Sequence, residues 1–355
     1  MFRRAVLCYT EFRIKTHTVY KLEDHFMKKL FLVGPGKTVV KDVPKPEIKD
    51  DEILIKVKYY GVCMSEHDAW LEAEGGNGVD EGFGHEPLGV VEAIGSKITK
   101  VKVGDRVTGC FAGNIAEYNT AKECDVYLVP DGVRDEDAIG EPLACLLSAV
   151  SKVPMSFPGE SSVAVVGCGY MGCGAISLLK LRGAGKVVAV DIRKECLEDA
   201  LRYGADEAYL PEELPDEYLA GWEHIGRGGF DYVMEWGETN ESLDLAIRMT
   251  KMCGFLGIGS YHTGGKRLVD VQLLNVKAID CLSTHPREAD LLSKGFVNAM
   301  ELLGNGKWNY KNLPVKIYPM SKFDLAHQEI KSKYGKYMKA IIDCEKQDGE
   351  EYIVK

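Results

Sequence analysis

The chain has 355 residues, more than one ordinary domain of about 100 to 200 residues, so two domains are expected. Apolar residues make up 45% of the chain and charged residues 28%, which excludes a disordered or fibrous protein. The formal net charge of -10 leaves no chain-wide basic footprint, so neither nucleic acid nor a membrane is expected as a partner. The 11 cysteines include no C-x-x-C pair, which favours reduced thiols and a cytoplasmic location.

The first part of the chain has the pattern of a β-rich domain. Residues 1–26 are predicted to be an N-terminal extension, with an extra strand packed on the body as the alternative. Apolar runs between glycine turns then predict strands at 28–33, 53–59, 88–94, 115–120 and 126–129. From Glu141 the period becomes helical, because Leu143, Leu146 and Val150 fall on one face.

The second part of the chain alternates strands and helices. Strands are predicted at 163–166, 186–192, 230–234, 254–259 and 278–284, with helices beginning near 171, 194 and 240 between them. This alternation indicates a doubly wound parallel sheet, an α/β fold. A helix at 288–303 and strands at 315–318 and 340–343 follow. The uncharged run 161–179 contains four glycines and changes period, so no membrane span is predicted.

A glycine-rich turn follows the strand at 163–166 and begins the next helix. Gly167 permits the tight turn, Gly169 lets a pyrophosphate approach the backbone, and Gly172 lets the helix pack on the strand. Asp191 ends the next strand, where it would bind ribose hydroxyls and repel a 2′-phosphate, which favours NAD over NADP. The predicted cofactor-binding residues are Gly167, Gly169, Tyr170, Met171, Gly172, Asp191 and Arg193. The alternative is a glycine turn with a surface aspartate and no ligand.

Four residues with metal-binding side chains lie beside glycine or proline turns, mostly in the β-rich part: Cys63, His85, Glu86 and Glu141. Zinc binds thiolate, imidazole and carboxylate groups, and a catalytic zinc site keeps one position open for water or substrate. Each residue alone has a simpler interpretation, as a buried thiol, a core histidine or a solvated carboxylate. Their combination favours a zinc site.

The order of these motifs resembles the zinc-containing medium-chain alcohol dehydrogenases. The similarity runs from about residue 27 to residue 345 and includes Gly61-Val62-Cys63-Met64-Ser65, Gly84-His85-Glu86, Val103-Gly104-Asp105-Arg106-Val107 and the glycine-rich turn. The step Glu141-Pro142-Leu143-Ala144 is similar to the sorbitol and polyol dehydrogenase branch. The clustered cysteines of the family's structural zinc lobe are missing between Val107 and Tyr118. We therefore predict one zinc ion per subunit.

The resemblance implies a Rossmann NAD-binding domain at 152–289 and a GroES-like catalytic domain built from 27–151 and 290–355. It implies Cys63, His85 and Glu86 as zinc ligands, with Glu141 either a direct ligand or one reached through water. The predicted catalytic residues are Ser65, His67 and Glu86. Ser65 matches the hydroxyl that passes on the substrate proton, and His67 lies one residue before the family's relay histidine, whose place Asp68 occupies.

The implied function is oxidation of a secondary alcohol to a ketone, with hydride transfer to NAD. A polyol, an inositol or a sugar derivative is the expected substrate. The alternatives are a zinc-free NADPH-dependent quinone or enone reductase of the same fold, and a non-catalytic dinucleotide-binding protein. The apolar strand at 278–284 lies where the family pairs its subunits, so a homodimer or homotetramer is expected.

Overall fold

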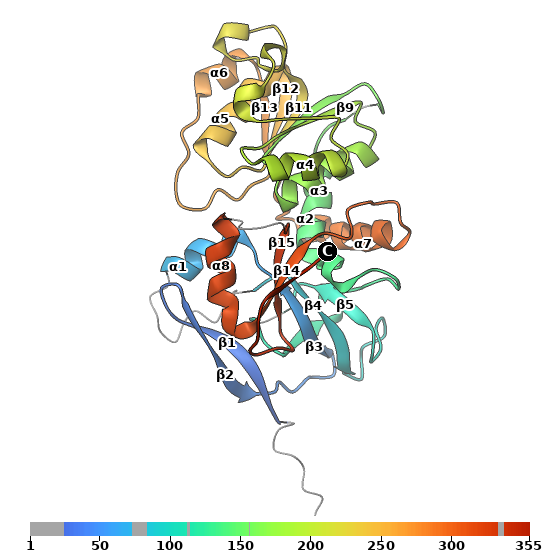
Figure 1. Ribbon diagram of the computed structural model, residues 1–355. Coiled ribbons are helices and arrows are strands. Elements are labelled where there is room, and N and C mark those ends of the chain that lie inside the picture. The colour runs from blue at the N-terminus through green and yellow to red at the C-terminus, as the bar shows by residue number, and fades with distance from the viewer. Residues whose placement is uncertain (1–24, 73–83, 112–113, 156, 333–336) are drawn as a thin grey trace, which may run out of the picture.

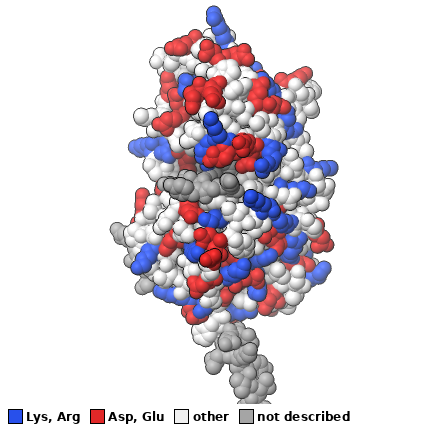
Figure 2. Space-filling view, in the orientation of Figure 1, with Lys and Arg blue, Asp and Glu red and all other residues white. Residues whose placement is uncertain are grey.

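The computed structural model describes residues 25–72, 84–111, 114–155, 157–332 and 337–355, and these form two lobes (Figure 1). The predicted N-terminal extension lies outside the described residues except for its last two. No helix in these ranges is long and apolar enough to cross a membrane. On the face shown in Figure 2, acidic and basic side chains are interspersed over both lobes.

One lobe is built on a six-stranded parallel sheet with the order β10-β9-β8-β11-β12-β13. In chain order this is 3-2-1-4-5-6, the doubly wound arrangement expected from the sequence, with a switch point between β8 and β11. Its strands are β8 (Ser162–Val166), β9 (Lys186–Val190), β10 (Glu207–Tyr209), β11 (Phe230–Glu235), β12 (Thr250–Ile258) and β13 (Asp280–Ser283). Its helices are α3 (Tyr170–Leu181), α4 (Lys194–Arg202), α5 (Asn240–Met249) and α6 (Val271–Val276).

The centre of this sheet is buried on both faces. After Ser162, every residue of β8 is buried, and the same is true of β9 after Lys186. Such continuous runs of valine and alanine are typical of parallel strands covered by helices on each side. The carboxyl ends of β8 and β11 therefore meet at one edge, where ligands bind in folds of this type.

The other lobe contains an eight-stranded, mainly antiparallel sheet. Its strands are β3 (Glu52–Gly61), β4 (Pro87–Ile94), β5 (Arg106–Gly109), β6 (Tyr118–Lys122), β7 (Val126–Leu128), β14 (Val315–Pro319), β15 (Lys339–Asp343) and β16 (Tyr352–Val354). A separate hairpin consists of β1 (Phe26–Gly34) and β2 (Lys37–Pro44). Strand β15 pairs with β3, so the last part of the chain lies beside its first part. This lobe is therefore assembled from both ends of the described chain.

Helices join the two lobes. α2 (Gly140–Ser151) contacts α7 (Ala289–Gly304) and also α3 of the parallel-sheet lobe, which carries the glycine-rich turn and is called the nucleotide lobe below. One buried apolar cluster includes Leu88 of β4, Leu146 of α2 and Val165 of β8, so a single core extends across the junction. The sequence did not predict two helices, the short α1 (His67–Glu72) and α8 (Phe323–Ser332). Of these, α8 packs beside β14 and β15 (Figure 1).

Candidate active site

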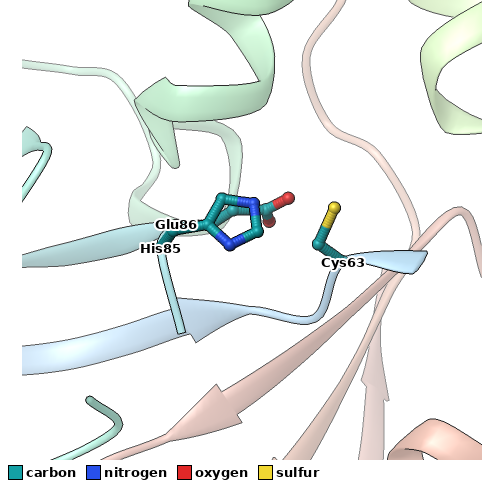
Figure 3. A group of neighbouring side chains, drawn as sticks. All are labelled: Cys63, His85 and Glu86. Carbon is teal, nitrogen blue, oxygen red and sulfur yellow. The ribbon is translucent and has the colours of Figure 1, made fainter. Parts of the chain in front are cut away.

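Three predicted metal ligands meet where β3 ends and β4 begins. Cys63 follows β3, and His85 and Glu86 come directly before β4; because these strands pair antiparallel, the two segments are adjacent. One donor atom from each residue lies within 4.8 Å of the other two. Figure 3 shows the thiol, the imidazole and the carboxylate at one place. This donor set, one sulfur, one nitrogen and one oxygen, is of the kind that binds zinc.

The His85 ring is oriented by a carboxylate behind it. Its Nδ1 lies 2.8 Å from Oε1 of Glu66, which is buried and also accepts a hydrogen bond of 2.6 Å from the Gly84 backbone N–H. This contact leaves Nε2 for a metal, as in carboxylate–histidine–zinc arrangements. Burial alone would lower the pKa of His85, but the Cys63 thiolate and Glu66 raise it to about 12. The Cys63 thiol and the Glu66 and Glu86 carboxylates suit this place to a cation, and its sulfur, nitrogen and oxygen donors fit a zinc ion.

The Glu86 carboxylate occupies a space that glycine makes available. A Cβ atom at Gly61 would lie 1.9 Å from Oε2 of Glu86, so no larger residue fits there without movement. The same oxygen lies 2.5 Å from Nζ of Lys339 on β15, and both side chains are almost fully buried. Burial would lower the pKa of Lys339, but the negative charges of Glu86 and Cys63 raise it overall. Lys339 thus balances the negative charge of the donor set.

Two further predicted residues, Glu141 and Ser65, line the cavity into which the three donors open. Glu141, at the start of α2, lies outside the group of three donors, and its Oε1 accepts a hydrogen bond of 3.2 Å from the Cys145 thiol. Burial and the neighbouring Glu86 raise the pKa of Glu141. Ser65 donates a hydrogen bond of 3.2 Å to the Cys63 sulfur. Ser65 is therefore within reach of anything bound at that sulfur.

The predicted relay residue His67 is placed differently. It is buried beneath the site, with its ring centroid 5.4 Å from Trp70 and 5.9 Å from His327, and it does not line the cavity. Asp68, which occupies the position of the family's relay histidine, lies towards the nucleotide lobe, because a Cβ at Gly264 would be 3.4 Å from its Oδ2. The structure does not bring His67 together with Ser65 at the cavity wall.

One cavity of about 760 Å³ connects the metal donors with the glycine-rich turn. Among its lining residues are Cys63, His85 and Glu86 on one side, and Gly167, Gly169, Tyr170, Met171, Gly172, Asp191 and Arg193 on the other. Gly167 has a φ of +91°, and a Cβ there would lie 2.5 Å from the Trp236 carbonyl carbon. A Cβ at Gly172 would lie 1.9 Å from the Gly167 oxygen. A side chain at either position would therefore clash with the backbone, as the glycine-rich motif predicts.

The acidic residue of the nucleotide site already has partners. Asp191 accepts hydrogen bonds from the Cys168 N–H at 2.7 Å and from the Arg193 N–H at 2.9 Å. The Arg193 guanidinium also pairs with it, with Nε 3.0 Å from Oδ1. A ribose bound here would share the carboxylate with Arg193.

Comparison with known proteins decides the family. Residues 49–132 match the alcohol dehydrogenase GroES-like domain, and residues 171–286 match the zinc-binding dehydrogenase family; the two matches together cover more than half of the chain. The chain belongs to the zinc-containing medium-chain alcohol dehydrogenases. It is therefore an oxidoreductase of the alcohol dehydrogenase type, with a zinc site and a nicotinamide cofactor, as the resemblance implied.

Individual relatives agree with this family. The D-xylulose reductase A of Aspergillus oryzae is 26% identical over 350 residues, which cover 88% of this chain and 95% of the relative. A structure from Sinorhizobium meliloti bound to NADP superposes with a TM-score of 0.75 at 20% identity, over 90% of this chain and 99% of the other. The 2R,3R-butanediol dehydrogenase of Bacillus subtilis gives a TM-score of 0.73 at 22% identity, over 89% and 99%. Both structures confirm the predicted fold.

Two residues that the sequence did not point to contact the candidate metal donors. Glu66 orients His85, and Lys339 neutralises Glu86. Glu66 stands three residues after Cys63 in a polar run, which is a weak signal by itself. Lys339 is more than 250 residues from Glu86 in the chain and carries no local signal, because only the pairing of β15 with β3 brings it there.

Proposed function

We propose that this dehydrogenase oxidises a secondary hydroxyl group of a polyol or sugar derivative to a ketone, with NAD as the hydride acceptor. The observation that carries the proposal is the single cavity that contains both the Cys63, His85 and Glu86 donors and the glycine-rich nucleotide turn. The similarity to the fungal D-xylulose reductase supports a polyol as substrate. The presence of all three donors argues against the zinc-free reductase alternative.

The residues at and beside the donor cluster have distinct parts in this proposal. Cys63, His85 and Glu86 would hold zinc, and zinc, when bound, would polarise the substrate oxygen and lower the pKa of the hydroxyl group. Glu66 fixes the imidazole, so that Nε2 faces the donor cluster. Ser65, beside the Cys63 sulfur, would accept the substrate proton and pass it on. Glu141 remains the candidate for a fourth ligand, direct or through water.

The preference for NAD rests on Asp191. Its carboxylate would repel a 2′-phosphate, and Arg193 is held in an ion pair with it and is not available as a free cation. One zinc ion per chain is expected, because a single donor cluster is found in the described residues. We keep the division into a catalytic domain at 27–151 and 290–355 and a nucleotide domain at 152–289 as part of the proposal.

A combined metal and substrate assay tests the proposed function. Elemental analysis of the purified protein should give about one zinc per chain, and xylitol, sorbitol and inositol should reduce NAD faster than NADP. Cys63→Ala and His85→Ala should lose zinc and activity while retaining NADH affinity, because neither residue belongs to the nucleotide turn. Full activity in either variant, or a chelator-insensitive enzyme that prefers NADPH, would reject the proposal.

We also propose a homo-oligomer, either a dimer or a tetramer, paired through β13. All four residues of this edge strand are exposed, including Leu282 at 43%. An exposed edge strand offers unpaired backbone groups to a second copy. Light scattering at micromolar concentration should give at least twice the monomer mass, and Leu282→Lys should lower the measured mass towards that of the monomer.

The cytoplasm is the proposed compartment, since no disulfide joins the cysteines of the described residues.

A further inference from the structure

His285 lies at the wall of the catalytic cavity without a role in the machinery described above. It follows β13, and it lines the same cavity as Cys63, Ser65 and His85. The cavity therefore presents a second histidine on the nucleotide lobe, opposite the metal donors of the catalytic lobe.

The backbone around His285 is held in place. Its carbonyl oxygen accepts a hydrogen bond of 3.0 Å from Nζ of Lys152. The preceding residue, Thr284, is buried and donates to the Ile258 carbonyl through both its N–H, at 2.9 Å, and its hydroxyl, at 3.0 Å. The imidazole thus extends from a fixed point at the end of the sheet and needs little reorganisation to meet a ligand.

The imidazole itself has unused hydrogen-bonding capacity. Its Nδ1 is buried and has no hydrogen-bond partner among the described residues. The nearest aromatic neighbour, Tyr261, also lines the cavity, and its ring centroid lies 6.2 Å away in a tilted arrangement without a hydrogen bond between the rings. Buried polar atoms are nearly always paired in folded proteins, so an unpaired nitrogen on a ring that lines the cavity points to a ligand that pairs it.

The charge state of His285 indicates which kind of ligand the imidazole binds. Burial first, and then the positive charges of Arg287 and Lys152, lower its pKa, and a hydrogen bond to the Pro286 backbone opposes only part of this shift. At neutral pH the ring is therefore uncharged, with one nitrogen that donates and one that accepts. A hydroxyl group, which also donates and accepts, matches this better than a carboxylate, which would favour the protonated ring.

We infer that His285 determines specificity by hydrogen-bonding a second hydroxyl group of the substrate, on the carbon next to the one that is oxidised. This inference rests on the proposed function and narrows it to vicinal diols and polyols. A substrate with one hydroxyl group would leave the imidazole unpaired and would be accepted less well. Sites that hydrogen-bond a substrate hydroxyl discriminate against analogues that lack it, for this reason.

A matched pair of substrates tests the inference. Butane-2,3-diol and butan-2-ol differ by one hydroxyl group, so the ratio of their kcat/KM values measures its recognition. The ratio should fall roughly tenfold in His285→Phe, which keeps an aromatic ring but has no hydrogen-bonding nitrogen, and His285→Asn should recover part of it. Calorimetric titration of the diol into the zinc-loaded enzyme with NADH bound should show a Kd weakened by a similar factor.

The outcomes separate this inference from the proposed function. An unchanged ratio in His285→Phe, including a uniform loss on both alcohols, would overturn the role of His285 while leaving the polyol dehydrogenase proposal standing. A wild-type enzyme that oxidises neither the diol nor any polyol would overturn the proposed function, and the inference with it. NADH affinity and the thermal unfolding midpoint of each variant show whether it is folded. If His285→Phe is misfolded, the diol to monoalcohol ratio of kcat/KM is compared between His285→Asn and His285→Ala instead. A higher ratio in His285→Asn supports the inference, and equal ratios overturn it.

Discussion

Replacing Lys339 by methionine should destabilise the zinc-free protein far more than the zinc-loaded protein. The substitution keeps a similar volume but leaves the Glu86 carboxylate, whose side chain is 1% exposed, without its cationic partner at 2.5 Å. Removing one partner of a buried ion pair costs about 3 to 5 kcal/mol, because the remaining charge stays desolvated. At roughly 2 to 4 °C per kcal/mol, the chelator-treated variant should melt at least about 6 °C below the wild type.

Zinc should recover much of this loss, because the metal supplies the positive charge that the lysine provided. The zinc-induced rise in melting temperature should therefore be larger in Lys339→Met than in the wild type. Lys339→Arg is the matched control, since it keeps the charge. A zinc-free variant as stable as the wild type, or an equal response to zinc in both, would refute the view that Lys339 and zinc compensate the same carboxylate.

Three further substitutions follow from the structure. Gly61→Ala should abolish zinc binding, because its Cβ would lie 1.9 Å from the Glu86 carboxylate oxygen; elemental analysis measures this. Asp191→Asn should improve NADP relative to NAD in kcat/KM by tenfold or more, because it removes a negative charge and releases Arg193 for a phosphate. Lys277→Met should flatten the pH dependence of stability above pH 8, since burial lowers the pKa of this lysine to about 8; urea unfolding at several pH values measures it.

The sign of the lysine effect is fixed by linkage. Between pH 8 and about 10.5 the unfolded chain keeps the Lys277 proton that the folded protein has lost, so wild-type stability rises with pH there. A Lys277→Met variant whose stability rises with pH as steeply as that of the wild type would contradict this.

Gly34→Ala is the control for Gly61→Ala, because a Cβ at Gly34 meets nothing within 4 Å. Zinc retained by Gly61→Ala, or an unchanged NADP to NAD ratio in Asp191→Asn, would likewise contradict its prediction.

The strand and helix pattern of the sequence was enough to predict most of the fold. The runs at 163–166 and 187–190 consist of valine and alanine, and such runs are typical of parallel strands that helices cover on both faces. Helix α1 was not predicted because six residues give too short a pattern. Helix α8 does carry a helical signal in the sequence, because Phe323, Ala326 and Ile330 are spaced i, i+3 and i+7 and are buried where the helix packs beside β14 and β15.

The site was predictable where its chemistry is local. The site's local motifs are the glycine-rich turn, the Cys63 loop and the adjacent His85 and Glu86. Each is short, and nucleotide or metal binding requires the residue types that it contains. By contrast, the burial of His67 beneath the site depends on Trp70 and His327, which lies about 260 residues later. Its predicted relay role remains a prediction.

By itself, then, the sequence determined which donors and which nucleotide turn the protein has, because turn geometry and metal-ligand chemistry act over a few residues. Only the tertiary structure decided which other residues surround these donors and this turn. The pairing of β15 with β3 brings Lys339 to Glu86, and the end of β13 brings His285 to the cavity. In both cases segments about 200 residues or more apart in the chain come together. Such long-range placement depends on the packing of the whole chain and not on any local sequence pattern.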